Sequence, residues 1–234
     1  MVIRYASREL KTAGPNAGRQ TMGQREEMVS CSLVPGNLAQ AIQKPGLYFQ
    51  GCGSNLHPEL VRSLVLSEPP LLRLLPELEG GKAIFNEFMS KVWEPATRGF
   101  LEGPEAGVKA AVDGFGELGY SGSDKKMTFE TLEPVVRSFL LDNAPEWRAL
   151  TSSRDPFPDL PPNAVAHIKV PTLLLSGQRS MTLNGLVDRQ LEKLLPQGER
   201  IIISNATHEM WNEYPEECRK EVLAFIGKHY HRLQ

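Results

Sequence analysis

The last third of the chain repeats one pattern, in which a short continuously apolar run is followed by an amphipathic run. The apolar runs are "IKVPTLLLSG" (168–177) and "ERIIIS" (199–204), and the amphipathic runs are "LNGLVDRQLEKLLP" (183–196) and "YPEECRKEVLAFIGKH" (214–229). Continuously apolar runs predict strands that are buried on both faces, and their alternation with helices is typical of a parallel sheet covered by helices on two sides. The sequence therefore predicts an α/β fold.

Upstream of these runs, the sequence predicts one more strand and then a long helical stretch. From Leu56 the composition changes, and "LVRSLVLSEPP" (60–70) is a short apolar strand that two prolines end. A mainly helical pattern then continues over roughly a hundred residues, with apolar residues at helical spacing that begin with Ile84 and Phe88, and the Pro-rich "RDPFPDLPPN" (154–163) is a linker. Apolar side chains at this spacing pack a core more often than they line a pocket, so we expect most of them to be core.

Residues 1–55 differ from the rest of the chain. They carry six Lys or Arg and three Glu but no Asp, and they show no sustained helical or strand periodicity. A basic interaction tail or a transit sequence is the alternative, but Glu9, Glu26 and Glu27 and the lack of an amphipathic stripe argue against it. We therefore predict a poorly ordered N-terminal segment (1–55) ahead of one α/β domain (56–234).

Composition excludes several classes of function. A net charge of −2 over 234 residues gives no reason to expect nucleic acid or an anionic membrane as a partner. The three cysteines, Cys31, Cys52 and Cys218, are widely spaced without a C-x-x-C pair, and the histidines lack ligand spacing, so no disulfide framework, metal or cofactor is expected. No apolar stretch reaches the roughly 18 residues of a membrane span, and no secretory signal is evident. A cytoplasmic protein is the expectation.

Polar side chains follow all three predicted strands. His208 comes after the last strand, Glu68 after the first, and Gln178, Arg179 and Ser180 after the middle one. Ligands bind at the carboxyl ends of the strands in an open parallel sheet, because the loops there converge. A histidine and a carboxylate at one such edge form the constellation in which the imidazole takes a proton and the acid holds its tautomer.

Three segments together resemble the C-terminal half of an α/β-hydrolase. They are "HPELVRSLVLSEPPL" (57–71), "IKVPTLLLSGQRS" (168–180) and "LLPQGERIIISNATHEMWNEYPEECRKEVLAFIGKH" (194–229). In that family they correspond to the strand after the nucleophile helix, the strand that usually carries the acid, and the histidine loop. The resemblance implies a parallel sheet of α/β-hydrolase type, here incomplete, and a helical cap inserted at about residues 71–160.

The resemblance also implies roles for two residues. His208 matches the general base. The family most often carries an Asp after the strand that here ends in "LLLSG", but Arg179 and Ser180 stand there instead. Some members, haloalkane dehalogenases among them, carry the acid after the preceding strand, and Glu68 matches that placement. Either position can reach the imidazole, since the mechanism requires only an acceptor at its second nitrogen. A surface or capping role for Glu68 stays the alternative.

The nucleophile of such enzymes is missing from its expected place. The family needs a strand, a sharp G-x-nucleophile-x-G turn and a helix ahead of the 60–70 strand, and residues 47–57 leave no room for that helix. Cys52 and Ser54 lack the small neighbours that the turn needs. Ser121 has them, but no apolar strand precedes it and it follows the 60–70 strand, so a flexible Gly/Ser loop is favoured there.

The oxyanion loop that precedes the nucleophile in the family is equally absent, so residues 1–55 do not encode the family's front half. A frame-shifted, mis-predicted or truncated gene is one hypothesis that explains this sequence. Three strands from one side of a larger sheet would leave an open edge, which favours self-association.

The sequence leads to two functions of different class. The first is a hydrolase that acts on a small, mainly apolar substrate through a nucleophile, His208 and Glu68. The alternative is a non-catalytic remnant or interaction module on the same scaffold, and a basic N-terminal arm that binds a partner is a weaker third idea. The bond that is cleaved and the oligomeric state stay open at this point.

Overall fold

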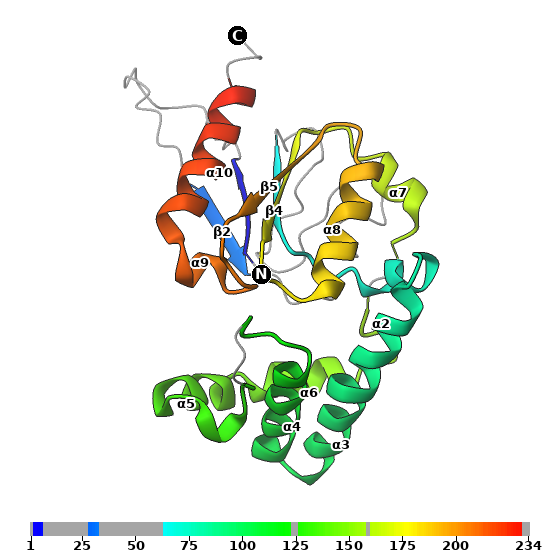
Figure 1. Cartoon of the computed structure of the whole chain (residues 1–234), viewed down its shortest axis with the longest axis vertical. Coiled ribbons are helices and arrows are strands. Elements are labelled where there is room, and N and C mark those ends of the chain that lie inside the picture. The colour runs from blue at the N-terminus through cyan, green and yellow to red at the C-terminus, as the bar shows by residue number, and fades with distance from the viewer. Residues whose placement is uncertain (1, 7–27, 33–62, 123–125, 158–159, 231–234) are drawn as a thin grey trace, which may run out of the picture.

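A computed structural model of the chain describes residues 2–6, 28–32, 63–122, 126–157 and 160–230 (Figure 1). Its five strands form one sheet in the order β2-β1-β3-β4-β5. The strands are β1 (Val2–Ala6), β2 (Met28–Ser32), β3 (Leu64–Ser67), β4 (Thr172–Gly177) and β5 (Gly198–Ile203). All three strands predicted from the apolar runs are therefore present, and two more lie in the N-terminal segment.

Strands β3, β4 and β5 are parallel, as the alternation of apolar and amphipathic runs predicts. Leu64 of β3 pairs with Thr172 of β4, and Thr172 pairs with Gly198 of β5. The carboxyl ends of the three strands consequently lie along one edge of the sheet, from which Glu68, Gln178 and the loop to His208 emerge.

Two helices cover the opposite faces of these strands (Figure 1). Because successive side chains of a strand point to opposite faces, Leu174 packs with the cluster under α8 (Thr182–Leu194), whereas Leu173 and Leu175 pack with the cluster under α10 (Pro215–Tyr230). All three leucines are fully buried. The continuous apolar run of β4 is thus explained by burial on both faces.

The run of β5 behaves differently from the prediction. Ile203 is fully buried, but Ile202 keeps 52% of its surface exposed. Among the described strands, β5 pairs only with β4 and forms an edge of the sheet, and an edge strand is covered less completely than a central one. The expectation that β5 is buried on both faces is therefore wrong for its solvent side.

A helical insertion, which we define as residues 71–157, separates β3 from β4. In Figure 1 the part of it formed by α3 to α6 lies as a layer facing the lower end of the sheet. The helices of the insertion, followed by the short α7 that leads into β4, are η2 (Leu72–Glu77), α2 (Gly81–Phe88), η3 (Met89–Trp93), α3 (Glu94–Glu102), α4 (Pro104–Glu117), η4 (Phe129–Thr131), α5 (Pro134–Asp142), α6 (Ala144–Thr151) and α7 (Pro162–Ala166). A helical segment here matches the position predicted for a cap.

One long helix of the insertion contains a wide turn with a clear cause. Helix α2, the π-helical turn η3 and α3 follow each other without a break. Pro95 has no N–H to donate to the carbonyl of Lys91, and its ring would clash with that carbonyl in a regular α-helix, so the backbone widens before it. A Cβ added to Gly114 of α4 would lie 2.0 Å from the Lys91 oxygen. Only glycine allows α4 to approach this turn so closely.

The N-terminal segment contains two strands that its sequence did not predict. β1 pairs antiparallel with β2 and, through Arg4 and Val65, with β3. The unpaired edge of β3 offers hydrogen-bonding groups to any extended segment, and "VIRYA" has the β-branched and aromatic residues that suit a strand. Neither strand was named from the sequence, and the expectation of a poorly ordered segment at 1–55 stays a prediction. The remaining residues of this segment lie outside the described parts of the chain.

None of the helices in the described ranges is long and apolar enough to cross a membrane.

Candidate active site

Glu68 lies immediately after β3 in a backbone conformation that is uncommon for a residue other than glycine. Its φ is 43°, in the left-handed region that costs a side-chain-bearing residue about 1 kcal/mol or more. Its carboxylate is buried and well satisfied. The backbone N–H of Gly177 donates to Oε1 at 2.7 Å, and Asn184 Nδ2 donates to Oε2 at 2.8 Å. These two donors fix the carboxylate and offset the cost of burying it.

His208 meets the same carboxylate from the loop after β5. Its Nδ1 lies 2.6 Å from Glu68 Oε2, and its side chain is 28% exposed while that of Glu68 is 1% exposed. The carboxylate accepts the Nδ1 proton, which leaves Nε2 of a neutral imidazole as a proton acceptor. Asn184 Nδ2 also lies 3.0 Å from His208 Nδ1, but both atoms carry protons that are directed to Glu68. The structure thus brings a partly exposed imidazole and a buried carboxylate into direct contact.

The two positions named from the sequence for the acid differ in their contacts. Glu68, after β3, is the residue whose carboxylate contacts His208. In the turn after β4, Gln178 Oε1 accepts the N–H of Asn205, and the N–H of Arg179 donates to the Ala206 carbonyl. This turn therefore supports the backbone of the histidine loop.

A second carboxylate fixes the loop just ahead of His208. Both the N–H and the hydroxyl of Thr207 donate to Glu213 on α9 (Met210–Glu213), at 2.7 and 2.9 Å. The Thr207 hydroxyl in turn accepts the N–H of Glu209 at 3.1 Å. The residues on both sides of His208 are thus hydrogen-bonded, which holds the imidazole in place.

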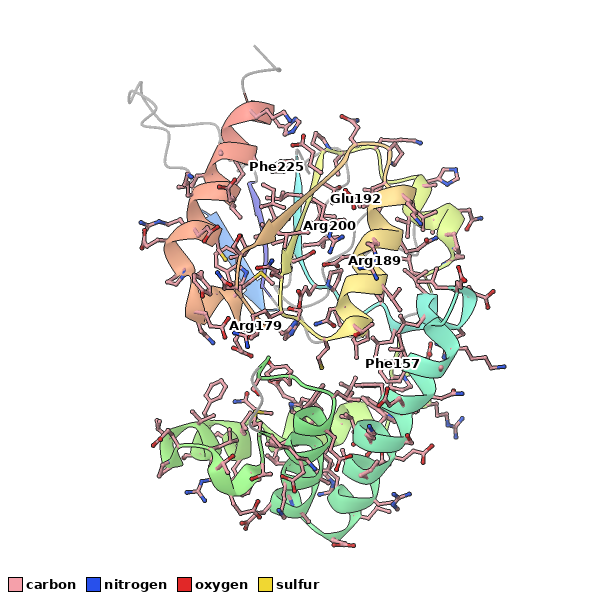
Figure 2. The ribbon with its side chains drawn as sticks, in the orientation of Figure 1. Phe157, Arg179, Arg189, Glu192, Arg200 and Phe225 are labelled. Atoms are coloured by element: carbon pink, nitrogen blue, oxygen red, sulfur yellow. The ribbon has the colours of Figure 1, made fainter. Side chains whose placement is uncertain are left out.

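The helical insertion reaches the site through the turn at residues 119–122. The rings of Tyr120 and His208 meet edge to face with their centroids 5.6 Å apart, and the Tyr120 hydroxyl donates to Glu209. Burial raises the pKa of Tyr120 well above its usual range. Gly122 lies against Thr207, since a Cβ added to it would be 2.8 Å from Thr207 Cγ2. In Figure 2 the label of Arg179, which follows β4, marks the end of the sheet that faces the insertion.

The nucleophile candidates named from the sequence have separate outcomes. Cys52 and Ser54 lie outside the described residues. Ser121 is half-buried in the turn between Tyr120 and Gly122, which packs against the histidine loop. Cys218, which was not named from the sequence as a nucleophile, lies on the buried side of α10, and burial raises its thiol pKa to about 11. A thiol with that pKa is a poor nucleophile at neutral pH.

A buried polar cluster lies one helical turn from Asn184 along α8. Ser176 Oγ donates to Asp188 Oδ2 at 2.5 Å and accepts from Arg200 Nε at 2.8 Å (Arg200 is labelled in Figure 2). Asp188 is fully buried, and its Oδ1 has no hydrogen-bond partner among the described residues. Burial raises the pKa of Asp188 to about 7, although the Ser176 hydrogen bond opposes the shift.

Sequence reasoning missed Asn184 although its position carries a signal. Asn184, Asp188 and Leu191 are spaced by four and three residues and share one face of α8, and all three are buried. A polar side chain on the buried face of an amphipathic helix needs a partner. Tyr120 and Glu213 gave no such signal, because their contacts with the histidine loop depend on tertiary packing.

The described parts of the chain hold no group of three or more His, Cys, Asp or Glu residues that could bind a metal ion.

Comparisons with known proteins locate the fold. No family model and no curated protein matches the chain. Among solved structures, MenH from S. aureus is 17% identical and superposes with a TM-score of 0.51 over 83% of this chain and 64% of that one. A carboxylesterase, CesB, from Bacillus subtilis is 20% identical with a TM-score of 0.48, over 72% of this chain and 52% of that one. The chain thus spans 64% of the length of MenH. The likeness to MenH confirms the predicted fold class, an incomplete sheet of α/β-hydrolase type, for the parallel strands β3, β4 and β5, to which β1 and β2 add an antiparallel part.

Proposed function

We propose that this chain, which carries part of an α/β-hydrolase fold, is a hydrolase with His208 as its general base and Glu68 as the acid that orients it. One observation carries the proposal, the 2.6 Å contact between His208 Nδ1 and a Glu68 carboxylate that is itself buried and held by two further donors. A buried acid directed at one nitrogen of a partly exposed imidazole is typical of hydrolases that use a nucleophile, a histidine and an acid.

The geometry supports a defined sequence of proton transfers. Glu68 accepts the proton on His208 Nδ1, so Nε2 is free to take a proton from a hydroxyl or a water as that oxygen attacks the electrophilic centre. The imidazolium formed in this step is stabilised by the Glu68 carboxylate. His208 then returns the proton to the leaving group.

The substrate we propose is small and mainly apolar. The insertion supplies an aromatic cluster that continues towards His208: Tyr120 lies 5.5 Å from Phe115, and Phe115 lies 6.2 Å from Phe88, between ring centroids. In this proposal the insertion acts as a cap that covers the substrate. Exclusion of water beneath a cap strengthens the electrostatic interactions that His208 and Glu68 make.

The test is hydrolysis of a short-chain chromogenic ester by the purified full chain. His208→Ala should lower the rate by roughly 10²- to 10⁴-fold, the usual contribution of a positioned general base. His167→Ala is the matched control, because His167 is an exposed histidine that contacts the carbonyl of Asn163. Equal rates in parent and His208→Ala would contradict the proposal.

A non-catalytic protein on the same scaffold is the second candidate, and one observation favours it. The neighbour of β3 on its outer side is the antiparallel β1, whereas the family resemblance calls for a strand that delivers the nucleophile ahead of β3. A parent protein that is folded by far-UV circular dichroism but does not hydrolyse the ester would favour this candidate over the first.

A further inference from the structure

We infer that Tyr120 is a positioning residue for His208, with its ring holding the plane of the imidazole and its hydroxyl securing the loop that carries it. The inference rests on the proposed function, because it concerns the same histidine. Tyr120 belongs to the helical insertion, 88 positions from His208 in the chain, so its contact with the site depends on how the insertion packs.

The first support is the way in which the imidazole is held. Glu68 binds one atom of the ring, Nδ1. A hydrogen bond at one ring atom does not by itself fix the plane of the imidazole. The edge-to-face contact with Tyr120, at 5.6 Å between centroids and 61° between planes, restricts that rotation. The two contacts together set the direction of Nε2.

The second support is the hydrogen-bond chain on the other end of Tyr120. Its hydroxyl donates to Glu209 Oε1, while the other oxygen of Glu209 accepts from Asn212 Nδ2 at 2.6 Å. Glu209 directly follows His208, so this chain holds the backbone of the histidine loop from the side opposite Thr207. Because burial raises the pKa of the Tyr120 phenol, it remains a donor throughout the physiological range.

The third support is the anchoring of Tyr120 itself. Its ring packs on Phe115 of α4, and Phe115 meets Trp147 of α6 edge to face with centroids 6.1 Å apart. Tyr120 therefore extends an aromatic cluster inside the insertion. A change in the packing of the insertion is transmitted to His208 through this ring.

The test separates the ring from the hydroxyl. Tyr120→Leu removes both, Tyr120→Phe removes the hydroxyl alone, and Tyr214→Phe is the matched control. Tyr214 packs on the cluster under α10, which lies on the other face of the sheet. The readout is the imidazole ¹⁵N spectrum of histidine-labelled full-length protein, with the His208 signals assigned by their loss in His208→Ala. These shifts report which ring nitrogen carries the proton and do not require any activity.

In the parent we expect the His208 shifts of a single tautomer protonated at Nδ1. In Tyr120→Leu the shifts should move towards the average of two tautomers, and ester hydrolysis should fall roughly tenfold to a hundredfold, as expected when a catalytic group is displaced by about an ångström. Tyr120→Phe should give a smaller shift in the same direction, and Tyr214→Phe should match the parent.

The inference would be overturned by a parent His208 that already averages two tautomers, or by a Tyr120→Leu protein whose His208 shifts equal those of the parent. A shift that appears equally in Tyr214→Phe would also overturn it, since that would reflect general loosening. An inert parent with Tyr120-dependent His208 shifts would contradict the proposed function and leave the positioning role supported. An active parent whose His208 shifts are unchanged in Tyr120→Leu would support the proposed function and contradict the positioning role.

Discussion

The two ends of the sheet are held in different ways. Strands β3, β4 and β5 pair in parallel and are covered by α8 on one face and α10 on the other. Strands β1 and β2 pair with each other along their whole length, but β1 registers with β3 at Arg4 and Val65 alone. The parallel strands build the pair of Glu68 and His208 from their own loops. The proposed acid and base therefore come from this end of the sheet alone.

Truncating the core of the parallel end should have the largest effect on stability. Leu174 of β4 is fully buried in the cluster under α8, and Leu174→Ala should lower the free energy of unfolding by about 2–5 kcal/mol, as buried leucines do elsewhere. Arg4→Pro is the partner experiment at the N-terminal end, because proline removes a backbone donor from β1. We expect it to cost clearly less. Urea denaturation of both variants measures the comparison, and an Arg4→Pro cost equal to that of Leu174→Ala would break it.

The two ends of the sheet also differ in how well the sequence predicts their structure. The runs of β4 and α8 predict their structures because local pattern and burial agree. The exposure of Ile202 was not predictable, because it depends on β5 lying at the edge. The strands β1 and β2 were missed since five-residue segments carry little periodicity and β1 gains its second partner only in the folded sheet.

The candidate site was predictable in part for similar reasons. His208 and Glu68 follow predicted strands, and parallel strands bring their carboxyl ends together, so chain order was sufficient to pair them. The support from Asn184 lies in a helix, where only its place on the buried face distinguishes it. The contact with Tyr120 comes from packing of the insertion, which no local pattern in the sequence specifies.

Substitutions of Asn184 test its hydrogen bond to Glu68. Asn184→Ala removes a donor to the buried Glu68 carboxylate, and a lost hydrogen bond to a charged group costs about 1.5–3 kcal/mol. Asn184→Asp should cost more at neutral pH than at pH 4, because it places a second carboxylate against Glu68. Thermal unfolding at the two pH values tests this order. An Asn184→Asp protein as stable as the parent at neutral pH would contradict the contact.

Asp188, which lies on the buried face of α8, should make the stability of the fold depend on pH. Its folded pKa of about 7 lies above its ordinary value of 3.8, so the native state holds this proton to a higher pH than the unfolded state. Asp188 therefore destabilises the fold progressively as the pH rises through this window, by at most about 1.4 kcal/mol per unit of pKa shift.

Asp188→Asn should remove that dependence, because an amide keeps an acceptor for Ser176 and does not ionise. The difference in free energy of unfolding between variant and parent should favour the variant more at pH 8 than at pH 5. A difference that is the same at both pH values would show that Asp188 is ionised throughout.

The central claim is that Glu68 and His208 act as acid and base. Its most direct test is the ester hydrolysis rate of Glu68→Gln, measured beside Glu192→Gln at the same protein concentration. Glu192 lies on the outer side of α8, 3.8 Å from Arg200, and it is half exposed. The account predicts that Glu68→Gln lowers the rate by roughly 10²-fold or more, since glutamine no longer holds the base in its working tautomer, while Glu192→Gln leaves the rate unchanged. A Glu68→Gln protein that is folded and as active as the parent would contradict the assignment of Glu68 and His208 as the acid and base.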